Sequence, residues 1–314
     1  MSRENPVLLY ACDDVDTEDW LAGLRRALPL ADIRVWPEAG ALEEIECAFV
    51  WRHPAGLLGR LPALRAVFSL GAGVEHILRD PSMPPDVPLV RMVDPGLVAG
   101  MNEYVLWAAL HHHRQMPRYE AQQSQPHWAQ WVPPLPQQRR VGILGLGQLG
   151  GTCATTLSGL GFDVAGWSRT YRRLAQVKTY AGPDELPSLL ARTEILVCLL
   201  PLTAQTENLL DAHRLAMLPR GASLINVARG RHVVDADLIA ALDAGHLESA
   251  TLDVFREEPL PASHPFWTHP KIRLTPHISA LTQIETAAQT LAENVRRLYA
   301  GEPMIGLVDR RRGY

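Results

Sequence analysis

Short apolar runs alternate with stretches of helical periodicity along most of this chain. The first series of runs, each typical of a buried strand, covers Val7–Ala11, Ile33–Trp36, Ala48–Val50, Ala66–Ser69 and Leu89–Met92. Strands of a parallel sheet are buried on both faces, so they are apolar throughout, and crossover helices join them. The pattern therefore predicts an α/β domain with a parallel sheet in the first third of the chain.

A second series of strands follows a predicted helix at Gly96–His113 and a polar, proline- and glutamine-rich loop at Arg114–Arg140. Its runs are Arg140–Leu144, Phe162–Trp167, Ile195–Leu199, Ser223–Val227, Ser249–Leu252 and Ile272–Leu274. Six strands fill a dinucleotide-binding sheet, so the last predicted helix, Ile284–Tyr299, should return to the first domain.

We therefore predict an α/β protein with two doubly wound parallel-sheet domains. A Rossmann dinucleotide-binding domain at 99–281 is inserted into a flavodoxin-like substrate domain made of 1–98 and 282–314. Because the chain crosses the boundary twice, we expect a hinge, with the active site in the cleft between the domains.

Composition narrows the class of protein. The 314 residues are 47% hydrophobic and 20% charged, with a formal net charge of −4, so we expect a globular protein without nucleic-acid or membrane partners. No apolar run approaches membrane-spanning length, and the four cysteines include no C-x-x-C pair, which favours the reducing cytoplasm. The run His111–His113 ends a predicted helix, where cationic side chains are favourable, and we predict no metal site.

The clearest motif joins the second series of strands to its first helix. It reads Gly145-Leu-Gly147-Gln-Leu-Gly150, directly after the apolar run that ends at Leu144. Gly145 permits a tight turn, Gly147 has no Cβ to block a pyrophosphate, and Gly150 lets the helix pack against the strand. Free N–H groups at the start of such a helix face the phosphates, so the motif predicts a dinucleotide site.

The end of the next predicted strand indicates which dinucleotide binds. Ser168 and Arg169 lie there, where an Asp or Glu normally accepts the ribose hydroxyls of NAD. A carboxylate would repel the 2′-phosphate of NADP, whereas a hydroxyl and a guanidinium favour it. We predict that NADP(H) is preferred and that NAD(H) binds more weakly.

Residues suited to chemistry follow the later strands. Arg229 ends one strand beside a glycine, so its guanidinium can reach a cleft and bind a carboxylate. Two adjacent acids, Glu257 and Glu258, come after the next strand, and His277 follows the strand after that. A histidine oriented by a carboxylate donates and accepts protons near neutral pH. An arginine, a glutamate or a histidine alone is often structural. The prediction of an active site therefore rests on the position of all of these residues after successive strands.

Longer motifs cover nearly the whole chain. Besides the glycine motif they are Phe68–Ile77, Asp94–Leu97, Asn102–Leu106, Trp167–Thr170, Asn226–Gly230, Leu252–Phe255, Thr275–Ile278 and Val308–Tyr314. Together they resemble the D-2-hydroxyacid dehydrogenase family, and most closely its branch of glyoxylate and hydroxypyruvate reductases. The resemblance implies NADPH-dependent hydride transfer to a small 2-oxoacid, from glyoxylate to glycolate or from hydroxypyruvate to D-glycerate.

The resemblance also implies roles for individual residues. Arg229 holds the 2-oxoacid, and His277 is the acid and base of catalysis. Glu258 pairs with His277, because it directly precedes a proline, as the family's glutamate does. Backbone amides of Gly71, Ala72 and Gly73 bind the substrate carboxylate, and Trp51 closes a small pocket. Cofactor contacts are implied for Gly145, Gly147, Gln148, Leu149, Gly150, Ser168, Arg169, Thr170, Leu200, Pro201, Val227, Ala228 and Asp253.

Some alternatives stay open. Asp253 could equally hold a structural hydrogen bond. The chain could reduce a longer 2-oxoacid, or it could be a dinucleotide-sensing regulatory scaffold, because proteins of similar fold are also used in that way. Relatives form dimers through an extension of the cofactor domain, so we expect a homodimer, with Trp128 and Trp131 as candidates for contacts with the second subunit.

Overall fold

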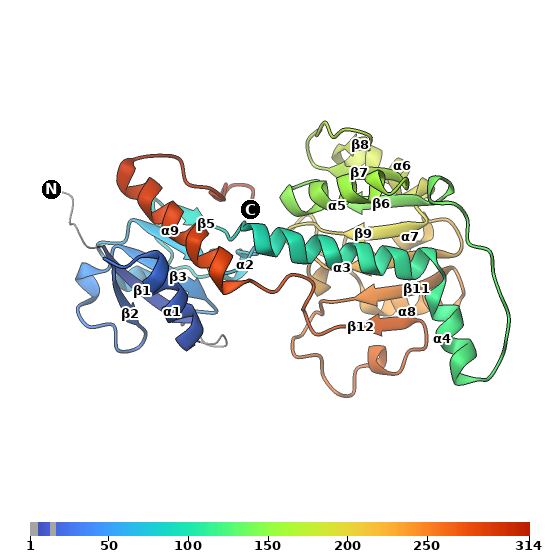
Figure 1. The fold of residues 1–314 in the computed structure, drawn as a ribbon, viewed down its shortest axis with the longest axis horizontal. Helices are drawn as coiled ribbons and strands as arrows, with labels where there is room; N and C mark the ends of the chain where they lie inside the picture. Colours follow the sequence, from blue (N-terminus) through green and yellow to red (C-terminus); the bar gives the residue numbers. More distant parts are fainter. Residues whose placement is uncertain (1–5, 13–16) are drawn as a thin grey trace. The chain divides into compact units, whose positions relative to one another are not determined.

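The computed structural model describes residues 6–12 and 17–314, and the chain divides into two compact units (Figure 1). The first unit takes in the chain up to Leu97 and again from Thr282, and the second runs from Val98 to Leu281. The first boundary lies one residue before the predicted one. Within the described part of the chain, no helix combines the length and apolar composition that crossing a bilayer requires.

The first unit is built on a parallel sheet with strand order β2-β1-β3-β4-β5. This is the flavodoxin-like order, as predicted. The strands are β1 (Val7–Cys12), β2 (Asp32–Val35), β3 (Cys47–Trp51), β4 (Ala66–Ser69) and β5 (Leu89–Val90). The helices are α1 (Thr17–Ala27), α2 (Glu75–Leu78) and α9 (Ile284–Ala300).

Helix α9 returns to this unit and packs against α1, as Figure 1 shows in red and dark blue. The approach is close at Gly23, where an added Cβ would lie 2.8 Å from Cγ2 of Ile284. The apolar residues of α9 recur at helical spacing and form one buried face. Packing of this face explains why the end of the chain belongs to the first unit.

The second unit contains a seven-stranded sheet with order β12-β11-β10-β9-β6-β7-β8, parallel throughout. The strand order reverses between β6 and β9, which is the switch point of a Rossmann fold, where dinucleotides bind. The strands are β6 (Arg140–Leu144), β7 (Asp163–Ser168), β8 (Lys178–Ala181), β9 (Ile195–Cys198), β10 (Ala222–Asn226), β11 (Leu247–Leu252) and β12 (Ile272–Leu274). The predicted fold class is confirmed.

Two elements of this unit differ from the sequence prediction. The expected number of six strands is wrong, because β8 adds a polar strand that pairs only with β7 at the sheet edge. The expected loop at 114–140 is also wrong in part, because it contains helix α4 (Met116–Ser124). None of the residues of α4 is buried, so the helix has no apolar stripe that a periodicity could reveal.

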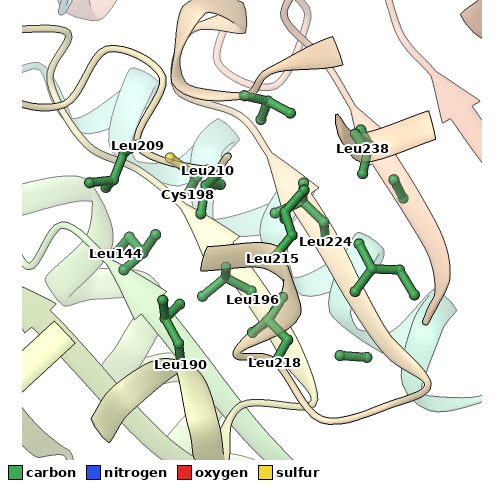
Figure 2. Close-up of a cluster of buried hydrophobic side chains, with 14 of the residues drawn as sticks. Leu144, Leu190, Leu196, Cys198, Leu209, Leu210, Leu215, Leu218, Leu224 and Leu238 are labelled. Carbon is green, nitrogen blue, oxygen red and sulfur yellow. The ribbon is translucent and has the colours of Figure 1, made fainter. Parts of the chain in front are cut away.

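The remaining helices flank the sheet and bury its core. They are α3 (Pro95–His113), which begins three residues before the unit boundary, α5 (Gln148–Gly159), α6 (Gly182–Arg192), α7 (Ala212–Ala216) and α8 (Asp235–Asp243). Figure 2 shows leucines of β6, β9, β10, α6, α7 and α8 meeting in one buried cluster. Burying one such side chain contributes about 1.5–3 kcal/mol, so this core holds the strand ends that carry the site.

Helix α3 is tied to β11 by a buried histidine. The Nδ1 atom of His112 lies 3.0 Å from Oγ of Ser249, and its Nε2 lies 2.9 Å from Oγ1 of Thr251. Burial lowers the pKa of His112 to about 3, and burial also lowers the pKa values of His111 and His113. The expectation that this run adds positive charge to the helix end is therefore wrong for His112, which is neutral at neutral pH.

Candidate active site

The glycine motif forms a sharp turn between β6 and α5. Gly145 has φ +100°, and an added Cβ there would lie 2.6 Å from the carbonyl oxygen of Leu199. An added Cβ at Gly150 would lie 1.8 Å from the carbonyl oxygen of Gly145. At Gly147, by contrast, an added Cβ would meet no described atom within 4 Å. Two glycines therefore allow close packing of helix and strand, and the third leaves open space above the turn.

This open space lies at the start of α5. The helix begins at Gln148, and no described side chain caps its first N–H groups. Such groups are unsatisfied donors at the positive end of the helix dipole, which favours a bound anion. The uncapped helix start and the surface left open by Gly147 fit the pyrophosphate of a dinucleotide.

The end of β7 carries hydroxyls and arginines rather than acids. Ser168 is the last residue of the strand, and its Oγ donates to the carbonyl oxygen of Thr170 at 2.7 Å. Arg169 follows and is exposed, and so are Arg172 and Arg173, which the sequence analysis did not single out. Three cations within five positions make this loop suited to a phosphate on the ribose.

The two most direct catalytic candidates lie in contact. Nδ1 of His277 is 2.7 Å from Oε2 of Glu258, and Oε1 of Glu258 accepts a hydrogen bond from the backbone N–H of Phe255 at 2.9 Å. Glu257 is exposed, so the second of the two adjacent acids is the one that contacts the histidine. The His277 side chain is 40% exposed, and its other ring nitrogen, Nε2, makes no hydrogen bond with a described residue.

The environment of Glu258 keeps its carboxylate charged. Burial is the largest influence and by itself raises the pKa of Glu258, but hydrogen bonds from His277 and from the Phe255 N–H outweigh it, and the nearby charge of Arg229 adds to them. The pKa of Glu258 is therefore lowered. The ionised carboxylate can accept a hydrogen bond from Nδ1 of His277, which lies 2.7 Å from its Oε2.

Arg229 lies in a tightly held turn after β10. The side-chain amide of Asn226 holds the turn, since its Nδ2 donates to the Arg229 carbonyl at 3.0 Å and its Oδ1 accepts from the Ala228 N–H at 3.2 Å. The next residue, Gly230, passes so close to another segment that an added Cβ would lie 1.9 Å from the carbonyl carbon of Phe255. A glycine at this position therefore lets the Arg229 turn pack against the segment that leads to Glu258.

His232 supports the same turn, although it was not among the predicted site residues. The residue is fully buried, and its Nδ1 accepts a hydrogen bond from the backbone N–H of Arg229 at 3.2 Å. Its Nε2 lies 3.3 Å from the carbonyl oxygen of Pro201. The histidine thereby connects two segments that were predicted to contact the cofactor. Its position three residues after Arg229 was the only signal in the sequence.

Asp253 holds the loop that carries His277. It is fully buried, and its two carboxylate oxygens accept hydrogen bonds from the backbone N–H groups of Ile278 and Ser279, each at 2.8 Å. The Thr275 hydroxyl donates to the same carboxylate at 2.5 Å, and the His277 N–H donates to the Asp253 carbonyl at 2.8 Å. These contacts support the structural alternative for Asp253, and its contact with a cofactor stays a prediction.

Other predicted cofactor residues lie at the carboxyl ends of β9 and β10. The side chains of Leu200, Val227 and Ala228 are buried, and Pro201 is half-buried, so these positions offer mainly backbone atoms to a ligand. In the described ranges, 6–12 and 17–314, no three His, Cys, Asp or Glu side chains are grouped as metal ligands would be.

The predicted substrate residues of the first unit also lie together. Trp51 is the last residue of β3, and its ring lies close to Gly71. A Cβ added to Gly71 would lie 2.5 Å from Cζ3 of Trp51. The Gly71 N–H donates to Oγ of Ser69 at 3.3 Å, whereas the N–H groups of Ala72 and Gly73 have no acceptor within the described part of the chain. The second and third amides of this loop, rather than the first, are therefore open to a ligand.

Comparisons with known proteins place the chain in a family. Residues 106–279 match the model of the D-isomer specific 2-hydroxyacid dehydrogenase NAD binding domain. Glyoxylate/hydroxypyruvate reductase A of Yersinia enterocolitica is 42% identical over 304 residues, which cover 95% of this chain and 97% of that protein. The corresponding protein of Photorhabdus laumondii is 41% identical over 304 residues, with the same coverage of 95% and 97%.

Solved structures agree in fold over the whole length. A D-isomer specific 2-hydroxyacid dehydrogenase of Xanthobacter autotrophicus, in complex with NADPH and MES, has a TM-score of 0.95 at 43% identity and covers 99% of this chain and 100% of its own. An NADPH-dependent glyoxylate/hydroxypyruvate reductase of Sinorhizobium meliloti, in complex with NADP and sulfate, has a TM-score of 0.92 at 36% identity, with coverage of 98% and 100%. The chain therefore belongs to the D-2-hydroxyacid dehydrogenase family.

Proposed function

We propose that the protein is an NADPH-dependent reductase of small 2-oxoacids, which converts glyoxylate to glycolate and hydroxypyruvate to D-glycerate. The observation that carries the proposal is the 2.7 Å contact between His277 and Glu258, in the unit that also contains the glycine turn. The names of the relatives and their coverage of nearly the whole chain support the same activity.

We propose that NADP(H) is held by the glycine turn and by the loop after β7. The pyrophosphate would contact the uncapped N–H groups of Gln148 and Leu149, and the 2′-phosphate would contact Ser168, Arg169 and Thr170. When bound, the reduced nicotinamide supplies the hydride. The other predicted contacts, at Leu200, Pro201, Val227, Ala228 and Asp253, are retained in the proposal.

In this proposal the chain's own residues bind the substrate and move one proton. Arg229 binds the substrate carboxylate and polarises the neighbouring carbonyl. The carbonyl carbon gains a hydride, and the oxygen gains a proton from Nε2 of His277, because Nδ1 is taken by Glu258. Glu258 stabilises the imidazolium before transfer and fixes the orientation of the ring.

The first unit would supply the remaining substrate contacts. We propose that the N–H groups of Ala72 and Gly73 bind the carboxylate, with Gly71 shaping the loop. The Trp51 ring covers Gly71 and would limit the size of the side chain on the substrate, which favours glyoxylate and hydroxypyruvate over longer 2-oxoacids.

A spectrophotometric panel tests this function. Purified protein is mixed with NADPH or NADH and with glyoxylate, hydroxypyruvate, pyruvate or phenylpyruvate, and absorbance at the nicotinamide band is followed. We expect the highest kcat/KM for NADPH with the two small substrates. No turnover with any 2-oxoacid would favour a dinucleotide-sensing scaffold, and a preference for phenylpyruvate would favour a larger pocket.

We also propose a homodimer that buries the surface of α3, α4 and the segment after α4. Large apolar side chains are exposed there: Trp107, Leu110, Met116, Trp128, Trp131, Val132 and Leu135. Trp128 is 91% exposed and Val132 is 96% exposed, and a patch of this kind is typical of an interface between copies. Light scattering after size exclusion tests the proposal, and a monomer at micromolar concentration would overturn it.

The cytoplasm is the proposed location. All four cysteines lie in described residues, and none is joined in a disulfide. Three of them are buried, and burial raises the pKa of Cys47, Cys153 and Cys198 to about 12, so these thiols are protected from reaction. Fractionation of cells that produce the protein tests the location.

A further inference from the structure

A line of hydrogen-bonded side chains runs from helix α3 to the loop that carries His277. Oη of Tyr104, in the middle of α3, lies 2.5 Å from Oγ1 of Thr275. Oγ1 of Thr275 lies 2.5 Å from Oδ1 of Asp253. All of these residues belong to the second unit, so the line is contained in one compact body.

The protons in this line can point in only one direction. Thr275 has a single hydroxyl proton, and it donates this proton to Oδ1 of Asp253. Thr275 must then accept from Tyr104, whose hydroxyl proton completes the line. Burial is the main reason that the pKa of Tyr104 rises to about 12, so this donor keeps its proton throughout the neutral range.

The far end of the line determines the backbone around His277. Asp253 accepts from the N–H groups of Ile278 and Ser279 through its side chain, and from the N–H of His277 through its carbonyl. His277 itself has φ +55°, a left-handed conformation that costs about 1 kcal/mol or more for a residue with a side chain. Such a conformation persists only where surrounding contacts hold it.

We propose that Tyr104 is a positioning residue, which fixes the orientation of His277 through Thr275 and Asp253. The inference rests on the proposed function, because it takes His277 as the proton donor. Tyr104 makes no described contact with His277 or Glu258, so its effect must pass through the intermediate residues. A residue of this kind should affect turnover more than the binding of substrate or cofactor.

The first experiment removes the tyrosine hydroxyl alone. In Tyr104→Phe we expect kcat with glyoxylate and NADPH to fall about fivefold, the change produced by losing a hydrogen bond worth about 1 kcal/mol. The KM for glyoxylate and the Kd for NADPH should stay near the wild-type values. An unchanged kcat, or a rise in the Kd for NADPH equal to the fall in kcat, would overturn the proposal.

The second experiment tests whether Tyr104 acts through Thr275. We expect Thr275→Val to lower kcat at least as much as Tyr104→Phe, and Thr275→Ser to retain most of the activity, because serine keeps the hydroxyl. Combining Tyr104→Phe with Thr275→Val should then add no further loss. If the fold-losses in kcat of the two single variants multiplied in the double variant, Tyr104 and Thr275 would act independently. That result would contradict an effect of Tyr104 through Thr275.

The control is Tyr299→Phe, in the first unit. This tyrosine also donates a partly buried hydrogen bond, to the carboxylate of Glu46, but it makes no described contact with Tyr104, Thr275 or Asp253. The Tyr299→Phe variant should lose about as much stability in thermal unfolding as Tyr104→Phe does, while its kcat stays at the wild-type value. A fall in kcat equal to that of Tyr104→Phe would mean that any lost tyrosine bond lowers turnover, and the specific role would be wrong.

A measurement without turnover separates this inference from the proposed function. Amide hydrogen exchange at His277, Ile278 and Ser279 should quicken in Tyr104→Phe and stay unchanged in Tyr299→Phe, whichever substrate the protein uses. If the wild type fails to reduce glyoxylate while this exchange pattern appears, the proposed function is wrong and the positioning of the loop stands. If exchange does not change in Tyr104→Phe, the positioning role is wrong.

Discussion

The buried His112 should make the protein sensitive to mild acid. The residue is 7% exposed, and each ring nitrogen lies within hydrogen-bond distance of a hydroxyl of β11. Burial is the main cause that lowers its pKa to about 3 from an ordinary value of 6.5, and positive charge on His111 and Arg273 adds to the effect. His112 therefore binds a proton at a much lower pH in the folded protein than in the unfolded chain.

The sign and the size of the effect follow from this difference. A histidine whose folded pKa is depressed contributes no penalty above pH 6.5, and stability falls as the pH drops from there toward 3. Each pH unit in that window costs about 1.4 kcal/mol, so the cost between pH 7 and pH 5 is about 2 kcal/mol. This is a large part of the stability of an ordinary domain.

The assay compares urea unfolding at pH 7 and pH 5 for the wild type and for His112→Gln. Glutamine does not titrate, and its amide can donate to one hydroxyl and accept from the other. We expect the variant to lose about 2 kcal/mol less between the two pH values than the wild type does. Other titrating groups cancel in the comparison, because both proteins contain them.

His213→Gln is the matched control, since His213 is exposed on α7. It should show the same acid-induced loss as the wild type. If His112→Gln and the wild type lost equal stability, the histidine would take up its proton in the folded state without cost, and its burial would not cause the acid sensitivity.

The remaining predictions concern the active site. Arg169→Asp should erase most of the preference for NADPH, with a loss of about tenfold or more in kcat/KM for NADPH, and an unaltered NADPH-to-NADH ratio in steady-state kinetics would contradict the assigned 2′-phosphate contact. His277→Ala should lower kcat by about 10²- to 10⁴-fold with little change in the Kd for NADPH measured by fluorescence titration. Glu258→Gln should move the alkaline limb of the pH profile of kcat to lower pH, because the negative charge that favours imidazolium is gone. Glu257→Gln should leave this profile unchanged. The reverse result would exchange the roles of the two acids. Arg229→Lys should raise the KM for glyoxylate and lower kcat together, and Arg229→Ala should do so more strongly, unless another group holds the substrate and efficiency stays near normal.

The α/β class and most strands could be predicted from the sequence because the signal is local. A parallel strand buried on both faces is a continuous apolar run, and it is recognisable without knowing its neighbours. The elements that were missed lack this signal. Strand β8 has the sequence Lys-Thr-Tyr-Ala at the sheet edge, and α4 buries none of its residues, so hydrophobic patterning cannot reveal either.

The glycine turn could also be predicted. Its glycines are needed because the backbone turns sharply or approaches another backbone segment closely, and these conditions are set by residues nearby in the chain or by the adjoining strand. The catalytic set was only partly accessible in this way. Arg229 and His277 follow strands, and a parallel sheet brings strand ends together, so their grouping was foreseeable from topology. Which of Glu257 and Glu258 contacts the histidine was not foreseeable from that topology, because adjacent side chains point in different directions.

The class of fold, the glycine turn and the chemical character of the site thus follow from the order of residues along the chain. The partners of each polar side chain depend instead on how distant segments pack. Asp253, Tyr104 and Thr275 lie far apart in the chain, and their line of hydrogen bonds exists because α3 packs beside the ends of β11 and β12. The physical reason is that apolar burial is set by the composition of short segments, whereas a hydrogen bond depends on the positions of two atoms that distant segments bring together.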